Sequence, residues 1–134
     1  MGNPFVHIEL NTDDVAKAKK FYKALFDWKL SEMPQMGYTM IDVGKGTGGG
    51  MQKMQMAGQV PAWLPYVDVA DVTKTLAKAA KAGAHVVLET TSIGPSMGEI
   101  GIFVDPTGAA IGVWGAGKKA PKKKAAKKKA AKKR

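Results

Sequence analysis

The first residues of the chain switch from an alternating pattern of apolar and polar positions to a helical one. In FVHIELNTDD, near the N-terminus, aliphatic residues alternate with His7 and Glu9. This period-two pattern predicts a strand with one face on a core, so His7 and Glu9 share the other face. Apolar residues then recur at helical spacing across residues 15–26, which predicts an amphipathic helix capped by Thr12 or Asp13.

Shorter apolar stretches, bounded by proline and glycine, predict the strands that follow this helix. The first three cover residues 28–33, 37–43 and 49–54. The same order then returns, with a strand from Trp63, a helix over 72–82 and strands over 85–89, 99–104 and 109–114. The sequence DPTG, residues 105–108, predicts a tight turn before the last strand.

The two halves of the chain repeat one unit of strand, helix and three strands. Placing the helix start at Asp14 over the helix start at Asp71 also places His7 over Leu64. A repeat of this kind is the signature of a duplicated structural unit. We therefore predict an α+β fold of two tandem βαβββ modules, about residues 3–57 and 61–116, within one domain over 1–117.

Composition favours a globular domain and excludes cysteine chemistry. Of the 134 residues, 45% are hydrophobic, which is enough for one domain with a buried core, and no cysteine is present. Disulfides and thiolate sites are therefore excluded. Because the chain lacks both an apolar stretch of roughly 20 residues and a signal-peptide pattern, we predict no membrane span and a cytoplasmic location.

The net charge of +10 belongs to the end of the chain. All 11 acidic residues and 10 of the basic ones precede Lys118, which leaves that part at −1, whereas residues 118–134 carry 11 basic residues and no acid. This lysine and alanine repeat resembles the tails of linker histones and some bacterial nucleoid proteins. Such a charge block predicts a disordered tail.

The basic tail predicts a polyanionic partner. Many lysines on a flexible strand release counterions from phosphates whatever the base sequence, and no aromatic interleaving indicates base reading. We predict nonspecific binding to nucleic acid through Lys122, Lys123, Lys124, Lys127, Lys128, Lys129, Lys132, Lys133 and Arg134. A solubilising extension and weak binding to anionic membrane surfaces are the alternatives.

Three features of the chain together resemble one known family. They are the opening HIELNTDD followed by KFY, the late DPTGAAIGVW, and the duplicated unit itself. In this order they resemble the vicinal oxygen chelate superfamily, the glyoxalase, bleomycin-resistance and extradiol-dioxygenase group, over about residues 3–115. The resemblance implies that the two modules pair their curved sheets into a partly open barrel, with ligands bound in the cavity between them.

The resemblance also implies where a metal site would lie. Metal-dependent members carry ligands on the first and last strands of the modules, and His7 fits the first of these positions. The equivalent position in the second module is Leu64, and the carboxylate expected after the DPTG turn falls on Gly112. The first module's last strand offers only Met51 and Gln52 nearby. Because at least two donors are missing, we predict no metal and no cofactor.

Strand parity within the family geometry predicts the residues that line the cavity. They are His7, Glu9, Tyr38, Met40, Leu64, Tyr66, Glu99, Phe103 and Trp114. Taken singly, each of these residues is better explained as a core or dimer contact; taken together, an aromatic and apolar wall with few polar groups suits a planar or amphipathic small molecule. His7 beside Glu9 can orient a polar ligand or act as an acid-base pair.

The main hypothesis is a homodimeric domain that binds a small apolar or aromatic molecule without metal and is tethered to nucleic acid by its tail. The alternative is an enzyme of the glyoxalase or dioxygenase kind, a lyase or oxidoreductase, with His7 and Glu9 as candidate catalytic residues. A second alternative is a nucleoid-associated protein that uses the folded domain only to dimerise. The fold alone does not separate these three functions.

Overall fold

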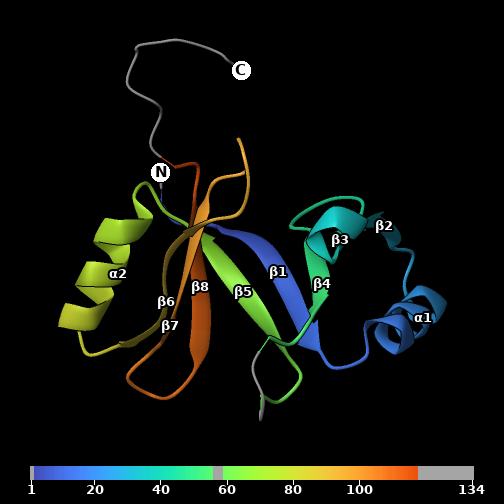
Figure 1. Ribbon diagram of the computed structural model, residues 1–134, viewed down its shortest axis with the longest axis horizontal. Coiled ribbons are helices and arrows are strands. Elements are labelled where there is room, and N and C mark those ends of the chain that lie inside the picture. The colour runs from blue at the N-terminus through green and yellow to red at the C-terminus, as the bar shows by residue number, and fades with distance from the viewer. Residues whose placement is uncertain (1, 56–58, 118–134) are drawn as a thin grey trace.

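The computed structural model describes residues 2–55 and 59–117, which form a curved eight-stranded sheet with two helices (Figure 1). The first module contains β1 (Phe5–Thr12), α1 (Val15–Leu25), β2 (Lys29–Met33), the short 3-10 helix η1 (Pro34–Met36), β3 (Tyr38–Asp42) and β4 (Gly49–Lys53). The second contains β5 (Ala62–Asp68), α2 (Val72–Lys81), β6 (His85–Ser92), β7 (Glu99–Val104) and β8 (Ala110–Gly115). The predicted α+β fold with a repeated βαβββ order is confirmed.

The sheet joins the two modules through their first strands. The strand order is β2-β3-β4-β1-β5-β8-β7-β6, so β1 and β5 lie side by side at the centre and pair antiparallel. Within each module the first strand pairs parallel with the last, β1 with β4 and β5 with β8. The remaining neighbours are antiparallel, which gives both halves the same local topology.

Each helix begins at an aspartate that caps it. The side chain of Asp14 accepts a hydrogen bond from the backbone N–H of Lys17, and that of Asp71 accepts one from Lys74, both at 3.0 Å. Such a cap satisfies one of the free N–H groups of the first turn. The prediction of Thr12 or Asp13 as the first cap is wrong, because α1 starts at Val15 and only the preceding residue reaches its first turn. No helix in the described part of the chain is long and apolar enough to cross a membrane.

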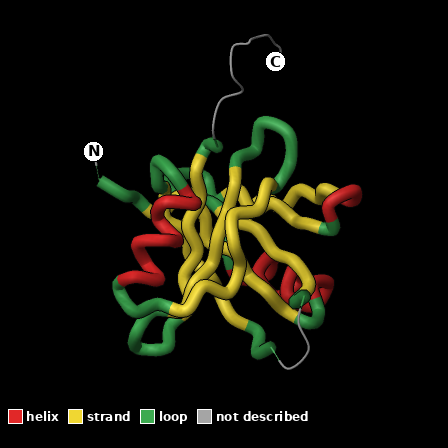
Figure 2. The backbone as a smooth tube through the Cα atoms, turned by 60° about the vertical axis from the view of Figure 1, so that its left-hand side comes forward, coloured by secondary structure: helices red, strands yellow, loops and turns green. Residues whose placement is uncertain are grey.

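Both helices pack on the face of the curved sheet that carries Leu10 and Val113, which we call the helix face. Figure 2 shows the two helices well apart from each other, with strands between them. Two small cores lie between this face and the helices. The core of the first module has Leu10, Ile41 and Met51 at its centre, and that of the second has Val72, Leu76 and Val113. Helix α2 thus contributes two buried residues, whereas α1 buries none of its own. The opposite face of the sheet is left free of helices.

The DPTG turn forms as predicted between β7 and β8. The carboxylate of Asp105 accepts hydrogen bonds from the N–H and hydroxyl of Thr107 and from the N–H of Ala109. These bonds favour the ionised form and lower the pKa of Asp105, with the Thr107 hydroxyl as the largest cause. Gly108 closes the turn with φ +98°, a backbone conformation that favours glycine.

Candidate functional site

The face of the sheet opposite the helices carries His7, and we call it the His7 face. Alternation along β1 places His7, Glu9 and Asn11 on this face, while Leu10 joins the core beneath α1. Residues of neighbouring strands that pair with His7 or Glu9 point to the same face of the sheet. Glu9 lies beside Leu64 and Gly50, and His7 lies beside Tyr66. Side chains from both modules therefore meet on the His7 face near the β1–β5 junction.

The carboxylate of Glu9 is the centre of a hydrogen-bonded cluster on this face. Glu9 is only 7% exposed. Its Oε1 accepts hydrogen bonds from Tyr66 Oη at 3.2 Å, Asn11 Nδ2 at 3.2 Å and Gln52 Nε2 at 3.3 Å. Its Oε2 accepts one from Tyr38 Oη at 2.9 Å. Four donors from four different strand positions thus compensate the burial of one carboxylate.

His7 joins the cluster through Tyr38 and not through direct contact with Glu9. The Nε2 atom of His7 lies 2.6 Å from Tyr38 Oη. Because the tyrosine hydroxyl already donates its hydrogen to Glu9, His7 must donate from Nε2, which assigns the proton to that nitrogen. Burial lowers the pKa of His7, and the charge of Glu9 offsets this only in part. A neutral His7 therefore presents Nδ1 as an acceptor.

The two tyrosines that bind Glu9 stay protonated over the ordinary pH range. Burial raises the pKa of both Tyr38 and Tyr66 far above the usual value, and the nearby charge of Glu9 and the hydrogen bond to it raise both further. Each phenol is therefore a fixed donor. The rings of both tyrosines lie over glycines at equivalent places in the two modules, Gly50 on β4 and Gly112 on β8.

Glycine at these two places is what lets the tyrosines approach the sheet. A Cβ atom at Gly112 would lie 2.5 Å from the ring of Tyr66, and one at Gly50 would overlap the ring and hydroxyl of Tyr38. Real Cβ atoms do not approach other atoms so closely, so a side chain at either place would displace the tyrosine above it. The packing of Tyr66 thus depends on Gly112, the position where the family resemblance placed a metal-binding carboxylate.

Two members of the cluster, Asn11 and Gln52, are absent from the predicted cavity lining. The amide of Gln52 donates to Glu9 and also to Asn11 Oδ1 at 3.0 Å, so it links the two. Asn11 follows His7 and Glu9 in the same alternation, so the period-two pattern, extended by two residues, would have predicted Asn11 on this face. Gln52 requires the parallel pairing of β1 with β4, which places it beside Asn11.

Among the predicted lining residues, the hydrogen bonds bring together His7, Glu9, Tyr38 and Tyr66. Three more share the His7 face without joining the cluster: Met40, Leu64 and Trp114. Leu64 lies beside Glu9 in the sheet, and Met40 lies beside Gly50. Trp114 lies beside Asp68, and its indole N–H donates to the backbone oxygen of Met97 at 2.9 Å.

The predicted placement of Glu99 and Phe103 on this wall is wrong. Trp114 pairs with Ile100 in the β7–β8 register, so the even-numbered residues of β7 share the His7 face. Phe103 therefore points to the helix face, where it packs against the core of the second module. Glu99 has the same parity and pairs with Gly115. A shift of one residue in a strand exchanges its two faces, which explains why both were misplaced together.

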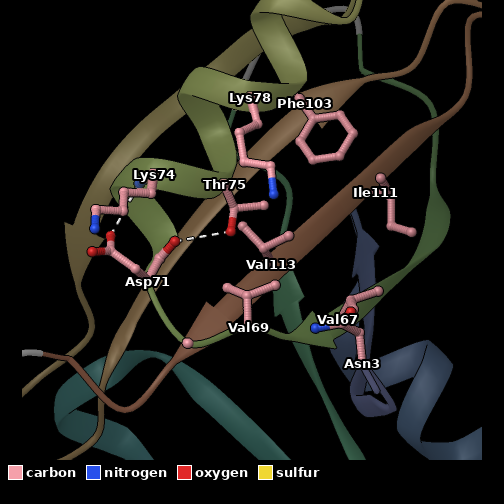
Figure 3. Close-up of a pocket in the computed structure, with 11 residues that line it drawn as sticks. Asn3, Val67, Val69, Asp71, Lys74, Thr75, Lys78, Phe103, Ile111 and Val113 are labelled. Carbon is pink, nitrogen blue, oxygen red and sulfur yellow. Dashed lines mark hydrogen bonds between the residues drawn. The ribbon is translucent and has the colours of Figure 1, made fainter. Parts of the chain in front are cut away.

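A cavity of about 520 Å³ lies on the helix face, away from the Glu9 cluster (Figure 3). Its floor is apolar and includes Val67, Phe103 and Val113, and α2 forms its wall. The amine of Lys78 extends over this floor in Figure 3. The polar groups of Asp71 and Thr75 on the wall already form hydrogen bonds within the first turn of α2. The cavity is thus a gap between helix and sheet, and the organised polar chemistry is on the His7 face.

The residues on the His7 face do not match a metal-binding set. Within residues 2–55 and 59–117, no group of three or more histidine, cysteine, aspartate or glutamate side chains converges on one point. The carboxylate of Glu9 is occupied by four donors, and Nε2 of His7 is bound to Tyr38. A divalent ion needs three or four such donors free to converge, so these residues do not fit one.

Comparisons with known proteins agree with this fold. The model for a bleomycin resistance protein-like N-terminal region matches residues 4–44. The "Putative glyoxylase CFP32" proteins of Mycobacterium bovis and Mycobacterium tuberculosis are each 32% identical to the chain over 118 residues, which is 83% of the chain and 45% of the relative. Together with the fold, these matches support the assignment of the chain to the glyoxalase and bleomycin-resistance group of the vicinal oxygen chelate superfamily. The chain spans less than half the length of these curated relatives.

Solved structures of low sequence identity share the superfamily fold. A hypothetical protein from Bacillus halodurans aligns with a TM-score of 0.63 at 11% identity, covering 90% of this chain and 99% of that one. Methylmalonyl-CoA epimerase from Mycobacterium tuberculosis aligns with a TM-score of 0.59 at 17% identity, covering 88% and 89%. At such identities the likeness concerns the fold alone, and function has to be argued from the side chains.

Proposed function

We propose that the His7 face binds a small, uncharged, planar molecule without a metal ion. The observation that carries this proposal is the hydrogen-bonded cluster in which Tyr38 bridges His7 to the buried Glu9. The cluster fixes the orientation of the His7 ring and directs Nδ1 away from Tyr38. Within the described residues no side chain or backbone group is recorded as a hydrogen-bond partner of Nδ1. A ligand N–H or O–H group is its natural partner.

The charges around the cluster support an uncharged ligand over an anionic one. The three strands that run through the middle of the sheet, β1, β5 and β8, contain no lysine or arginine. The one lysine of β4, Lys53, has the parity of the helix face. An anion beside Glu9 would therefore meet its charge without a compensating cation on the strands around it. Leu64, Met40 and the Trp114 indole supply apolar contact beside the polar cluster.

The absence of a metal follows in this proposal from the same contacts. Burying Glu9 among four donors favours its hydrogen bonds over coordination, and Gly112 leaves its strand without a ligand. Elemental analysis of the purified protein should then find far less than one zinc, nickel, iron or manganese per chain. A full equivalent of metal that is lost in His7→Gln would contradict the proposal.

Tryptophan emission offers a direct test of where the ligand binds. Trp114 is on the His7 face, whereas Trp28 and Trp63 contact Tyr22 on the helix face. We would titrate a panel of planar amides and phenols and follow the emission of the full chain and of Trp114→Phe. The expected signal is present in the full chain and absent from Trp114→Phe.

The matched variants His7→Leu and Lys78→Gln separate the two faces of the sheet. Loss of the acceptor in His7→Leu should weaken binding at least about tenfold, which corresponds to about 1.4 kcal/mol. Lys78 lines the cavity on the helix face, so Lys78→Gln should bind normally. Normal binding by His7→Leu together with loss in Lys78→Gln would place the ligand in the helix-face cavity and overturn the proposal.

A catalytic role for His7 is the second candidate, because its lowered pKa leaves the ring neutral with Nδ1 able to accept a proton. The curated relatives carry the description of glyoxylases, which supports testing this class of reaction. A lyase or oxidoreductase of the glyoxalase or dioxygenase kind should turn over a substrate of these enzymes and lose activity in His7→Gln. Binding without turnover, with or without added divalent metal, would favour the binding role.

The basic residues 118–134 lie outside the described residues, and their role remains the proposal of a nucleic-acid tether. The charge distribution supports it, since 11 basic residues follow a body with one excess acid. A tether of this kind would keep a small-molecule binding domain near nucleic acid, which implies a cytoplasmic location. The folded part and the tail are then two separate functions joined in one chain.

A further inference from the structure

The cavity on the helix face has an apolar floor and a basic wall. Its volume of about 520 Å³ falls within the range of about 300 to 1,000 Å³ that is usual for small-molecule sites. Val113 at the floor is buried, and Val67 and Phe103 pack against the same core. Helix α2 contributes Lys74 and Lys78 to the wall. An apolar hollow edged by positive charge fits a ligand that joins an apolar body to an anionic group.

Lys78 is the lysine placed to meet such an anionic group. Figure 3 shows its amine over the apolar floor, on the side of Phe103, whereas Asp71 lies on the other side of Thr75. In the part of the chain that the structure describes, neither this amine nor that of Lys74 forms an ion pair. Of the described residues that line the cavity, Asp71 is the one acid, and its carboxylate accepts the Lys74 N–H at the start of α2. The lining thus carries two amines against one carboxylate that is already hydrogen-bonded.

The equivalent helix position in the first module has an aromatic ring in place of this lysine. Aligning the starts of the two helices places Phe21 over Lys78. The ring of Phe21 lies 5.0 Å from that of Tyr22, which packs against the core of the first module. The βαβββ unit therefore accepts an apolar side chain at this place and does not require a charged one. The amine beside the cavity is a property of the second module.

Shorter side chains on the sheet leave space beneath Lys78. Met51 and Val113 each follow the equivalent glycine of β4 and β8. Leu10 and Val67 hold equivalent places on β1 and β5. Met51 is completely buried, so its long side chain fills the region between α1 and the sheet. Because protein interiors are otherwise close-packed, a valine at both places in the second module leaves room for a ligand.

We propose that this cavity is a second ligand site, which binds a medium-chain fatty acid with its carboxylate at the amine of Lys78. The aliphatic chain lies on the valines and Phe103 of the floor, where its removal from water is favourable. The carboxylate stays at the exposed amine and so keeps part of its hydration, which avoids the cost of burying a charge. One negative charge balances two lysines and one aspartate. This inference is independent of the uncharged ligand proposed for the His7 face.

Isothermal titration calorimetry of the full chain with decanoate, kept below its micelle concentration, tests the proposal. Lys78→Gln should weaken binding at least about tenfold, because the cation that meets the carboxylate is lost. Lys81→Gln is the matched control, since Lys81 is also exposed on α2 but does not line the cavity. It should bind decanoate like the wild type. Both variants lose one positive charge, so any contribution of the basic residues 118–134 is the same in the two.

Two further measurements test the apolar floor and the charge of the ligand separately. Val113→Met copies the first module and places a longer side chain in the cavity, so it should also weaken decanoate binding at least about tenfold, with circular dichroism to establish that it is folded. Decanol, which has the same chain without the charge, should bind the wild type at least about tenfold more weakly than decanoate and should bind Lys78→Gln equally well.

Three outcomes would overturn the proposal. They are a wild type that does not bind decanoate, a Lys78→Gln variant that binds it as tightly as Lys81→Gln does, and a wild type that binds decanol as tightly as decanoate. A folded Val113→Met with unchanged affinity would also exclude the cavity. If Val113→Met does not fold, the comparison of Lys78→Gln with Lys81→Gln still decides, because both side chains are exposed and their replacement leaves the core intact.

Discussion

At the scale of single residues, the organising feature is a buried carboxylate with four donors. Glu9 alone on the His7 face would be costly to bury, and each hydrogen bond offsets part of that cost. The four donors are on four different strands: Tyr38 on β3, Tyr66 on β5, Asn11 on β1 and Gln52 on β4. Removing any one donor leaves the carboxylate less compensated, so each contact has a measurable effect on stability.

Tyr66→Phe should destabilise the protein by about 1 to 3 kcal/mol, the cost of removing a partner from a buried charged group. Tyr66 is almost fully buried and donates to Glu9 Oε1. Urea unfolding of the full chain measures the change. Tyr22→Phe is the matched control, since the Tyr22 hydroxyl makes no hydrogen bond to any of residues 2–55 and 59–117. Equal stability of Tyr66→Phe and the wild type would show that the bond contributes nothing.

His7 should make the stability of the fold depend on pH in one direction. Burial lowers its pKa below 6.5, so on acidification the unfolded chain takes up a proton before the folded one. The contribution of a neutral His7 is complete above about pH 6.5 and is lost as the pH falls through the lowered value. Urea unfolding from about pH 7.5 to about pH 5.5 should therefore show a larger loss for the wild type than for His7→Gln. A larger loss in the variant would contradict this assignment.

At the scale of elements, the repeated module sets the positions of the site. Each first strand lies at the centre of the sheet, and each contributes to the cluster: Glu9 is on β1, and its donor Tyr66 is on β5. These two residues occupy equivalent places in the two modules. The alignment that places Asp14 over Asp71 also places Glu9 over Tyr66. Equivalent positions of the two modules thus supply one acceptor and one donor.

The aspartate caps are expected to contribute to the stability of the helices they begin. Asp71→Ala removes the acceptor for the Lys74 N–H and should destabilise the fold by about 0.5 to 2 kcal/mol. Asp71→Asn keeps an oxygen acceptor in the same place and should recover most of this loss. Thermal unfolding followed by circular dichroism compares the three proteins. If Asp71→Asn is as unstable as Asp71→Ala, the hydrogen bond is not what the aspartate contributes.

At the scale of the whole molecule, charge and fold are separated along the chain. The folded part is near neutral, and its sheet has one face for the helices and one for the Glu9 cluster. The basic residues follow the last strand. Affinity for polyanions is therefore expected to depend on the end of the chain and affinity for a small molecule on the sheet.

Binding to duplex DNA should be strong at low salt and should reside after Gly117. If the tail neutralises about five to eight phosphates, the logarithm of the binding constant should fall with the logarithm of salt at a slope of about −4 to −7. Electrophoretic shift on unrelated duplexes compares the full chain with a chain ending at Gly117. Sequence preference should be absent, because lysines on such a tail meet phosphates and not base edges. Retention of binding by the shorter chain would show that the tail is not the tether.

Local patterns in the sequence are enough to predict the repeated βαβββ order, the DPTG turn and the placement of His7 and Glu9 on one face. These features depend on local periods and turn residues, which act over a few positions. The family resemblance also identified two places without a ligand: Leu64, through the alignment of the two halves, and Gly112, through its distance from the DPTG turn. Local patterns are sufficient here because strand alternation and turn geometry are properties of short stretches.

The partners of Glu9 and the orientation of β7 depend instead on how distant strands pair in the folded protein. Gln52 reaches Glu9 because β4 pairs parallel with β1, and no local pattern contains that pairing. Phe103 was misplaced because the register between β7 and β8 is fixed by packing across the sheet, where one step exchanges the faces. The exposure of Phe21 also depends on how α1 lies on the sheet. Contacts between distant strands depend on burial of the whole core, so they cannot be predicted from the residues of one short stretch.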